Sequence, residues 1–328
     1  MKVPGFVDLQ VNGYMGIDFS SSELTEESCY FAFKKILETG TIIFMPTVIT
    51  SSMEVYRKNL GVMARVIERD DVRTHVPGIH LEGPFLSEVD GARGAHDADW
   101  IRKPDIASFE DFYEWSGRNI KLLTIAAELE GAAELCKYVT QLGITVSLGH
   151  QMAAEADLER LVKAGARSLT HLGNGLPMYI HRHDNPIWAG LANDQLTAMI
   201  ISDGHHINPS VLKTIIRNKG ISKTYITSDA SPIAGMPPGK YHTLGNNALL
   251  ENSGRLFNPD SGYLVGSSSM LIDCVNYLIS LDFLSNSEIF QMSFHNPLRL
   301  IDMDPDEILK QFQPHLEMNS GEVIVAKP

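Results

Sequence analysis

Short apolar segments alternate along the chain with longer stretches in which apolar residues recur every three or four positions. The short segments are rich in β-branched residues and nearly continuous in hydrophobicity, which is typical of strands buried on both faces. They cover residues 5–13, 41–50, 76–85, 120–128, 145–150, 168–175, 196–204 and 224–231. The stretches between them predict helices, among them 23–38, 52–69, 131–141, 153–163 and 209–217. This alternation predicts an α/β fold, a parallel (β/α)₈ TIM-type barrel. An open doubly wound sheet is the competing fold, but no GxGxxG motif follows the first strand.

The pattern changes after the last of these strands. Residues 232–266 are rich in Gly and Pro and predict a long loop with a hairpin. Residues 267–300 predict terminal helices, the first of which can be capped by the serines at 267–269, while Ser285 and Glu288 form a capping-box pattern. We therefore expect a barrel domain over 1–310 and a short C-terminal extension over 311–328, in which GEVIVAKP suits an edge strand.

Composition narrows the class of protein. Hydrophobic residues make up 44% of the 328 residues, enough for a large core, which excludes global disorder. The net charge of −13 repels phosphate backbones and anionic lipid, so we expect neither nucleic-acid nor membrane partners. No apolar run is long enough for a spanning helix or a secretory signal. The cysteines, Cys29, Cys136 and Cys274, are far apart and form no disulfide framework, so we expect a cytoplasmic globular protein.

Polar residues gather at the C-terminal ends of the predicted strands, which converge on one face of a parallel barrel. Glu82, His150 and His171 follow the third, fifth and sixth strands and match a set of two histidines and one carboxylate. Such a set suits Zn²⁺ with one position open for water. Taken singly, each residue could instead form an ion pair, cap a turn or satisfy a buried carbonyl. Taken together, they favour a metal site.

Three aspartates end strands of the same barrel. Asp229 in TSDAS is the candidate general base, because a carboxylate beside a metal-activated water can accept its proton. Capping of the next turn is the alternative role for Asp229. Asp203 in SDG is a turn former, since Gly204 permits a positive φ. Asp8 either orients a residue at the mouth of the barrel or pairs with a nearby base.

A second group of residues suits an anion. Asn174 and Gly175 in HLGNG follow a strand, where main-chain N–H groups can point into the mouth. Arg182 in IHRHD offers a guanidinium fork that matches phosphate oxygens, and His206 in DGHH follows the seventh strand. The alternative for Arg182 is a solvated loop in which it bridges to Asp184.

These residues resemble the N-acetylglucosamine-6-phosphate deacetylases of the amidohydrolase superfamily. The similar segments are PGFVDLQVNG, GTIIFMPTVIT, GIHLEGPF, GAH, SLGH, HLGNGLP, ISDGHHINP, TSDASPIAGMPPGKY and HNPLRL, from residue 4 to about residue 300. The resemblance implies a (β/α)₈ barrel with a metal on Glu82, His150 and His171, Asp229 as catalytic acid and base, and His96 polarising the acetamide carbonyl. It also implies that phosphate meets Asn174, Gly175 and Arg182, the last from the neighbouring subunit of a homodimer, and that His206 contacts the sugar.

The sequence departs from the family pattern in three places. We expect the family's small β-sandwich to be largely absent, because the first strand begins at residue 5 and little follows residue 310. The usual HLFNAM and REPG segments are HLGNGL and RHDN here, which bears on the exact amino sugar. The first strand ends in DLQVNG rather than HxH, and since Gln10 and Asn12 are poor ligands we expect one divalent ion rather than two.

The expected reaction is removal of the acetyl group from N-acetylglucosamine 6-phosphate. Zn²⁺ is the expected ion, although Fe²⁺, Mn²⁺ or Co²⁺ would suit the same ligands. Three alternatives stay open: deacetylation of the galactosamine epimer or of an unphosphorylated acetamido sugar, another amidohydrolase reaction such as cyclic amide hydrolysis, and a non-catalytic sugar-phosphate sensor.

Overall fold

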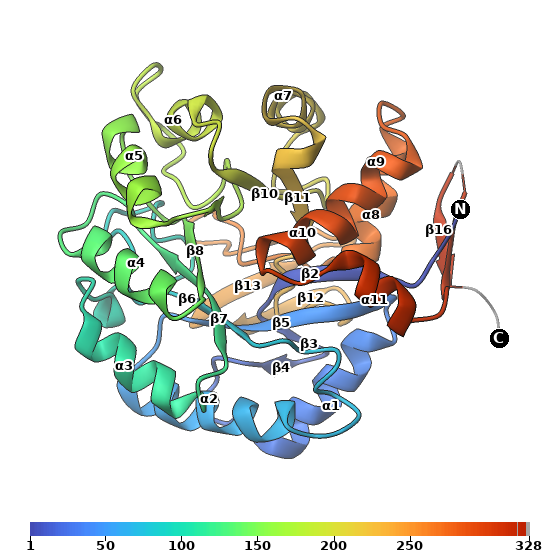
Figure 1. The fold of residues 1–328 in the computed structure, drawn as a ribbon, viewed down its shortest axis with the longest axis horizontal. Coiled ribbons are helices and arrows are strands. Elements are labelled where there is room, and N and C mark those ends of the chain that lie inside the picture. The colour runs from blue at the N-terminus through green and yellow to red at the C-terminus, as the bar shows by residue number, and fades with distance from the viewer. Residues whose placement is uncertain (320, 326–328) are drawn as a thin grey trace.

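Eight parallel strands form the centre of the molecule (Figure 1). The computed structural model describes residues 1–319 and 321–325. Neighbouring strands follow the order of the chain around the sheet, so each pairs with the strand before and after it. All eight predicted strands are confirmed: β2 (Phe6–Val11), β5 (Thr41–Ile49), β6 (Ile79–Glu82), β7 (Ile120–Ile125), β8 (Thr145–Leu148), β9 (Ser168–Leu169), β10 (Thr197–Ile201) and β11 (Thr224–Thr227).

The sheet closes into a barrel where β2 and β11 meet. Val11 and Ala230 form a parallel bridge, and the Asn12 N–H donates to the Ala230 carbonyl at 2.8 Å. Deeper in this seam, the Asp8 carboxylate accepts hydrogen bonds from the Thr227 hydroxyl at 2.6 Å and from the Ser228 hydroxyl at 2.5 Å. Asp8 therefore ties the first strand to the last, where the backbone ladder is incomplete.

Helices surround the barrel as the alternation predicts. Each packs an apolar face on the strands, and α1, for example, buries Cys29, Ala32, Phe33 and Ile36. The helices around the barrel are α1 (Glu26–Leu37), α2 (Met53–Ile67), α3 (Ile106–Trp115), α4 (Ala132–Gln141), α5 (Glu155–Ala164), α6 (Pro186–Ala192) and α7 (Pro209–Lys219), with short 3₁₀ turns at Ala98–Trp100 and Ile221–Lys223. The five predicted helices are confirmed, and α3 and α6 were not among them.

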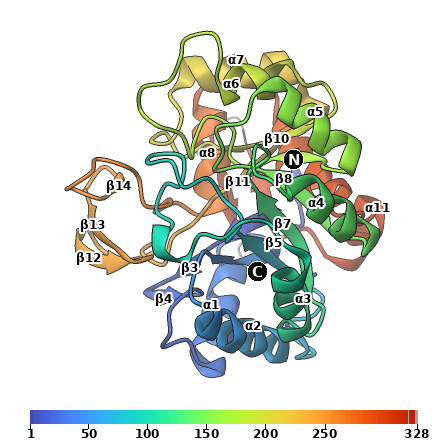
Figure 2. The ribbon, with the colours of Figure 1, turned by 90° about the vertical axis from the view of Figure 1, so that its left-hand side faces the viewer.

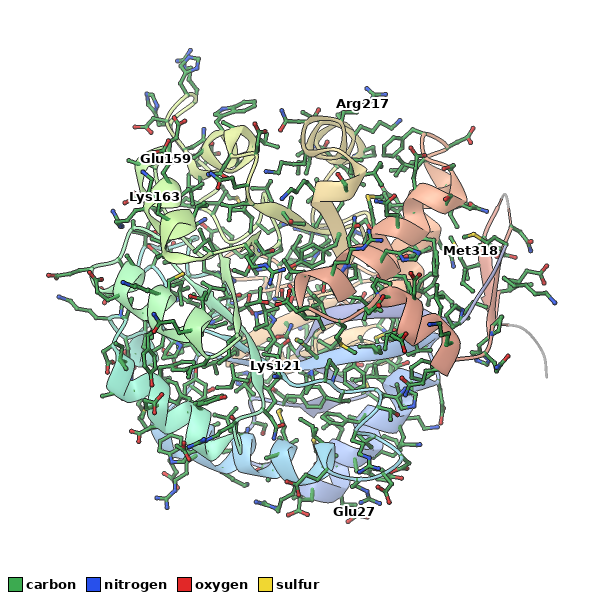
Figure 3. All side chains as sticks on the ribbon, viewed as in Figure 1. Glu27, Lys121, Glu159, Lys163, Arg217 and Met318 are labelled. Carbon is green, nitrogen blue, oxygen red and sulfur yellow. The ribbon has the colours of Figure 1, made fainter. Side chains whose placement is uncertain are left out.

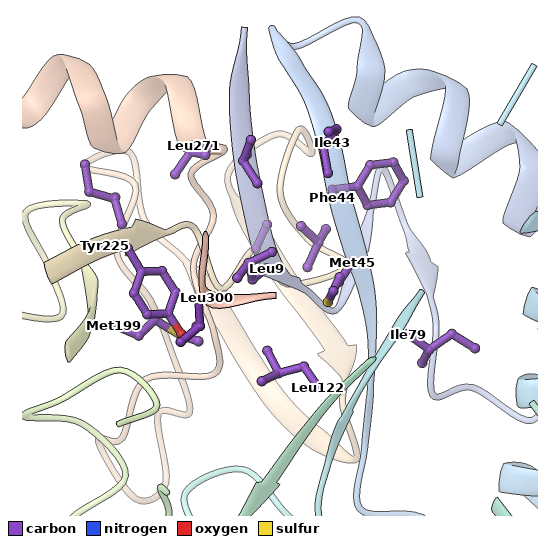
Figure 4. Close-up of a cluster of buried hydrophobic side chains, with 14 of the residues drawn as sticks. Leu9, Ile43, Phe44, Met45, Ile79, Leu122, Met199, Tyr225, Leu271 and Leu300 are labelled. Atoms are coloured by element: carbon purple, nitrogen blue, oxygen red, sulfur yellow. The ribbon is translucent and has the colours of Figure 1, made fainter. Parts of the chain in front are cut away.

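The core lies between the strands and the helices. Figure 4 shows part of it, with Leu9, Met45 and Leu122 from three strands beside Tyr225 and Leu271. All of these side chains are fully buried. Cys29, Cys136 and Cys274 are buried and free, as expected of cysteines on apolar helix faces.

The segment after β11 contains the predicted hairpin and terminal helices. Its elements are β12 (Gly239–Thr243), β13 (Asn246–Leu250), β14 (Leu256–Phe257), α8 (Leu271–Ser280), α9 (Asn286–Phe290), a π-helical turn at Gln291–His295, α10 (Asn296–Leu300) and α11 (Pro305–Gln311). The capping box of Ser285 and Glu288 is confirmed. The serine caps predicted for the preceding helix are wrong: α8 begins after Met270, whose N–H donates to Asp273 at 2.9 Å. A carboxylate at N3 caps this helix, and Ser267 instead donates to Asp203.

Two further small sheets accompany the barrel. β3 (Gly13–Tyr14) and β4 (Ile17–Asp18) form a short hairpin after the first barrel strand. At the other end of the molecule, β1 (Lys2–Val3) pairs with β15 (Leu316–Met318), which pairs with β16 (Val323–Val325). The predicted terminal strand is thus found, although Ala326–Pro328 lie outside the described residues. The boundary between the barrel domain and the C-terminal extension at residue 310 stays a prediction. β15, which lies in that extension, pairs with β1 at the N-terminus.

Charged side chains cover the outside of the barrel. Figure 3 labels exposed examples on four elements, Glu27, Lys121, Glu159 and Arg217. Among the described helices, none has the length and apolar composition needed to cross a membrane.

The seam at Asp8 predicts a specific pH dependence of stability. Burial raises the pKa of Asp8 from 3.8 to about 6, so the folded chain binds this proton more tightly than the unfolded chain does. The contribution of Asp8 to stability is therefore full below pH 4 and is lost as the pH rises through 6. We expect the free energy of unfolding of the wild type, relative to Asp8→Asn, to fall by on the order of 2 kcal/mol between pH 4 and pH 7. Urea unfolding of both proteins across this range measures it, and a difference that does not change with pH would contradict the assignment.

Candidate metal centre and active site

Three predicted ligands meet at the C-terminal end of the barrel. Glu82 is the last residue of β6, while His150 and His171 lie two residues beyond β8 and β9. Glu82 Oε1 is 3.3 Å from His150 Nε2 and 3.2 Å from His171 Nε2, and the two Nε2 atoms are 3.1 Å apart. All three side chains are buried. They form the one group of three or more metal-ligating side chains found in the described part of the chain.

The donor atoms of this group fit a divalent cation. The Nδ1–H of His150 donates to the Ala92 carbonyl at 2.8 Å, which leaves the Nε2 lone pair directed at His171 and Glu82. Converging electron-pair donors repel one another unless they share a cation. Bonds of 2.0–2.1 Å to a tetrahedral Zn²⁺ place ligand atoms about 3.3 Å apart. The observed separations of 3.1 to 3.3 Å match this spacing.

The backbone is strained at these positions. His150 and His171 have φ values of 50° and 30°, and Asp229, two residues beyond β11, has a φ of 50°. The left-handed region costs a non-glycine residue free energy and is found where the surrounding structure enforces it, commonly at functional sites. A Cβ on Gly175 would lie 3.0 Å from His150 Nδ1, so the turn after β9 packs directly on the ring of this ligand. These strained turns direct the side chains inward.

Asp229 lies beside the ligands and is held by two amides. Its Oδ1 accepts hydrogen bonds from Gln10 Nε2 at 2.9 Å and from Asn12 Nδ2 at 2.7 Å, and Gln10 Nε2 also donates to Glu82 Oε1 at 2.9 Å. Burial raises the pKa of Asp229, and the nearby Glu82 charge raises it further. A carboxylate that binds a proton more tightly than usual, with its second oxygen free of hydrogen bonds within the described chain, suits general acid–base chemistry.

His96 lies in the loop between β6 and α3, and its ring centre is 4.4 Å from that of His150. Its Nε2 is 3.8 Å from Glu82 Oε2, and its Nδ1 accepts the Thr50 backbone N–H at 3.3 Å. The proton of the neutral ring therefore resides on Nε2, which faces the site. Burial and the neighbouring His150 hold the pKa of His96 well below its ordinary value, so the ring stays neutral. Gly83, at φ 94°, is required here because a Cβ would lie 2.3 Å from the Thr50 hydroxyl that contacts His96.

Asp203 has two roles, of which the sequence predicted one. Its Oδ1 accepts the backbone N–H groups of His205 and His206 at 2.9 Å, which confirms it as a turn former. Its Oδ2 also accepts from His206 Nδ1 at 2.7 Å and from the Ser267 hydroxyl at 2.7 Å. The Asp203 carboxylate more than offsets burial and raises the pKa of His206. His206 is thus fixed in position, with Nε2 left to contact a ligand.

The metal-ligand group opens into a cavity of about 490 Å³. Asn174, Gly175 and His206 line it, as predicted for a substrate pocket. Arg182 does not line it: this residue is exposed on the loop between β9 and α6, and its carbonyl accepts the Trp188 indole N–H at 2.9 Å.

The β12–β14 hairpin forms a wall of the same cavity. Its loops contribute Leu244, Arg255 and Tyr263, and Asn246 donates to the Ala95 carbonyl at 3.1 Å, beside His96. Figure 2 shows the hairpin standing out from the barrel next to the loops at its mouth. The sequence indicated the hairpin, but gave no signal that it reaches the site.

The barrel and its buried Glu82, His150 and His171 define a hydrolase of the amidohydrolase class. The comparisons with known proteins agree. The chain is 36% identical over 284 residues to N-acetylglucosamine-6-phosphate deacetylase of Danio rerio, covering 84% of this chain and 69% of that protein. It is 33% identical over 312 residues to the Bos taurus deacetylase of the same name, covering 92% and 74%. The chain belongs to the N-acetylglucosamine-6-phosphate deacetylase family. No protein-family model matches it.

Solved structures show the same fold. The Mycobacterium smegmatis N-acetyl-D-glucosamine-6-phosphate deacetylase matches with a TM-score of 0.85 and 24% identity, over 98% of this chain and 87% of that one. The Pasteurella multocida enzyme of the same name matches with a TM-score of 0.82 and 25% identity, over 98% and 86%. A mutant of the M. smegmatis enzyme, with a TM-score of 0.84 and 23% identity over 99% and 87%, is in complex with N-acetyl-D-glucosamine-6-phosphate.

Proposed function

We propose that this chain hydrolyses N-acetylglucosamine 6-phosphate to glucosamine 6-phosphate and acetate. The observation that carries the proposal is the convergence of Glu82, His150 and His171 beside the buried carboxylate of Asp229. Family membership points to the same reaction, because the relatives are N-acetylglucosamine-6-phosphate deacetylases. A sensor would need the sugar-binding residues but not an acid–base carboxylate next to a set of metal ligands.

Glu82, His150 and His171 would hold one divalent cation, which we propose to be Zn²⁺, with Fe²⁺, Mn²⁺ and Co²⁺ as other ions that the same donors accept. Bound there, the ion would polarise the amide carbonyl and make the attacking water more acidic. Gln10 and Asn12, at the end of β2, direct their amide N–H groups at Asp229. Because amide groups are poorer ligands than the imidazoles of an HxH pair, these residues support a site for one ion.

Asp229 and His96 supply the proton transfers and the hydrogen bond to the reacting amide. Asp229 accepts a proton from the attacking water through its free oxygen, while Gln10 and Asn12 hold the other oxygen. The neutral His96 donates its Nε2–H to the carbonyl oxygen as negative charge develops on it. Asp229 then returns the proton to the nitrogen, because an amide nitrogen leaves as an amine rather than as an anion. The oxygen of the water is by then bonded to the carbonyl carbon, so that breaking the C–N bond releases the free amino sugar and acetic acid, which loses its remaining proton to give acetate.

This role of His96 predicts that its removal lowers turnover without a loss of bound metal. We expect His96→Ala to lower kcat by about 10²- to 10³-fold, the effect of removing one oxyanion donor. Thr50→Val, which removes the hydroxyl beside Nδ1 but keeps the ring, is the matched control and should lose less. Steady-state acetate release and elemental analysis of both variants measure this. A His96→Ala variant with near-normal kcat would rule out the proposed hydrogen bond.

The substrate phosphate would meet Asn174, Gly175 and Arg182 of the partner subunit in a homodimer. The main-chain N–H of Asn174 donates to the His171 carbonyl at 2.9 Å, while its side-chain Nδ2 has no hydrogen-bond partner within the described chain and is the donor that it can offer. The exposed position of Arg182 on a projecting loop supports a role across a subunit interface rather than within one chain. His206, held by Asp203, would contact the sugar hydroxyls. The buried free cysteines suit a reducing compartment, so we also propose a cytoplasmic location.

A second candidate is N-acetylgalactosamine 6-phosphate. The Escherichia coli O157:H7 deacetylase named for that substrate is 27% identical over 301 residues, covering 92% of this chain and 78% of that protein. Acetate release from both epimers and from unphosphorylated N-acetylglucosamine decides the question. We expect the highest kcat/KM on N-acetylglucosamine 6-phosphate. A preference for the galactosamine epimer would select the second candidate, and equal rates with and without phosphate would remove the phosphate from the proposal.

A further inference from the structure

The cavity contains one fixed cation that the reaction described above does not use. Among the described residues that line it, Arg255 is the one Lys or Arg. It lies at the end of the turn that joins β13 to β14, in the wall formed by the hairpin. The chemistry of the site offers no role for it in proton transfer, because guanidinium stays charged at any pH that the protein tolerates.

The guanidinium of Arg255 is free to bind a ligand. Within the part of the chain that the structure describes, it donates no hydrogen bond and has no carboxylate within ion-pair distance. The nearest acidic residue of the turn, Glu251, instead accepts from the Ser253 hydroxyl at 3.2 Å. The Arg255 guanidinium carbon lies 4.0 Å from the centre of the Phe257 ring, a cation–π contact that fixes the side chain while leaving its N–H groups available.

The backbone around Arg255 is also fixed in position. The Arg255 carbonyl accepts the Glu251 N–H at 3.0 Å, and the Gly254 carbonyl accepts the Ser268 hydroxyl at 2.5 Å. His205, which also lines the cavity, contacts the Ser253 carbonyl through Nε2 at 3.1 Å. The turn is thus tied to the barrel at the end of β10, next to His206. A side chain held in this way loses little conformational entropy when it binds a ligand.

The charge of the chain opposes the approach of an anionic substrate to this cavity. The chain has a net charge of −13, so an anionic substrate meets a repulsive field as it approaches. Within the cavity, the two carboxylates of Glu82 and Asp229 would offset the charge of one divalent ion bound there. Arg182 of the same chain is exposed and outside the cavity. Arg255 is the cationic side chain that the described lining of the cavity offers besides the metal-ion site, and its planar fork matches two oxygens of a phosphate group.

We propose that Arg255 binds the phosphate group of the sugar phosphate from within the same chain and is a specificity-determining residue for phosphorylated over unphosphorylated substrates. The inference rests on the proposed function for the identity of the sugar, but concerns a contact which that function does not require. It predicts that phosphate recognition survives, in part, without Arg182 of the partner subunit.

The test compares Arg255→Ala with the wild type on N-acetylglucosamine 6-phosphate and on N-acetylglucosamine. We expect kcat/KM for the phosphorylated sugar to fall by about 10- to 100-fold, because this is what the loss of a hydrogen bond to a charged group costs. Most of the change should be a rise in KM. The value for the unphosphorylated sugar should stay within a factor of about two of the wild type. Arg255→Lys should recover part of the loss, because it restores the charge without the fork. Lys240→Ala, an exposed cation of the same hairpin, is the matched control and should change neither value.

Direct binding separates this inference from the proposed function. Calorimetric titration with glucosamine 6-phosphate should show affinity about 10- to 100-fold weaker for Arg255→Ala than for the wild type, whether or not acetate is released. Unchanged binding and an unchanged ratio of the two kcat/KM values would overturn the role of Arg255. An equal loss on both sugars would also overturn it, because that result indicates a structural role. A wild type that releases no acetate from either sugar would refute the function, and the titration would still decide the contact.

Discussion

We expect Asp229→Asn to lower the rate of acetate release by about 10²- to 10⁴-fold while the metal content of the protein stays at the wild-type level. The substitution is conservative in shape, and its amide oxygen can still accept from Gln10 Nε2 and Asn12 Nδ2, as Oδ1 of Asp229 does. The change removes the oxygen that accepts a proton and leaves the hydrogen bonds that hold the side chain. The loss should therefore lie in kcat rather than in KM.

Elemental analysis and steady-state kinetics of the same preparation measure this effect. Asp184→Asn, an exposed aspartate on the loop beyond the cavity, is the control and should keep normal turnover. A variant that loses its metal would make Asp229 a ligand instead of an acid–base residue. Near-normal turnover would show that another group carries the proton.

We expect His171→Ala to abolish metal binding and acetate release together. The imidazole supplies one of the three donor atoms, and two donors of a tetrahedral site bind a divalent ion far less tightly. His171 is a better choice than His150 for this test, because its buried Nδ1 has no hydrogen-bond partner within the described chain. Glu82 Oε1, which His171 Nε2 faces at 3.2 Å, would still accept from Gln10 Nε2 after the substitution. Removal of His150 would leave the Ala92 carbonyl without its donor.

We expect less than a tenth of the wild-type metal content and turnover below detection in this variant, with the melting temperature of the metal-free proteins nearly unchanged. His183→Ala replaces an exposed histidine and should retain both metal and activity. A His171→Ala protein that retains stoichiometric metal would show that the ion is bound elsewhere.

The strands can be predicted from the sequence because parallel strands that are buried on both faces are nearly continuous apolar runs. All eight were found, and even β9, with two residues in the sheet, stood out as SLTHLGNG. Helix α6 was not predicted, since its seven residues are too few for a clear helical period. The cap of α8 was assigned wrongly because three serines form a strong local signal, while the carboxylate of Asp273 acts from inside the first turn.

The metal ligands were predictable for a physical reason: polar residues that directly follow buried strands must converge on the mouth of a barrel. His96 has no such signal, because it lies on a loop, and its place in the site came from the family resemblance alone. The sequence indicates only that Gln10 and Asn12 are poor ligands, because their hydrogen bonds to Asp229 depend on tertiary contacts across the seam of the barrel. Arg255 was missed because nothing in a sequence shows which face of a hairpin folds over a distant cavity.

The most direct test of this account is acetate release from N-acetylglucosamine 6-phosphate as Zn²⁺ is returned to the chelator-treated chain. The account predicts no release from the metal-free protein and a linear recovery that saturates at one ion per chain. Release that persists without metal, or no release at any loading, would contradict it.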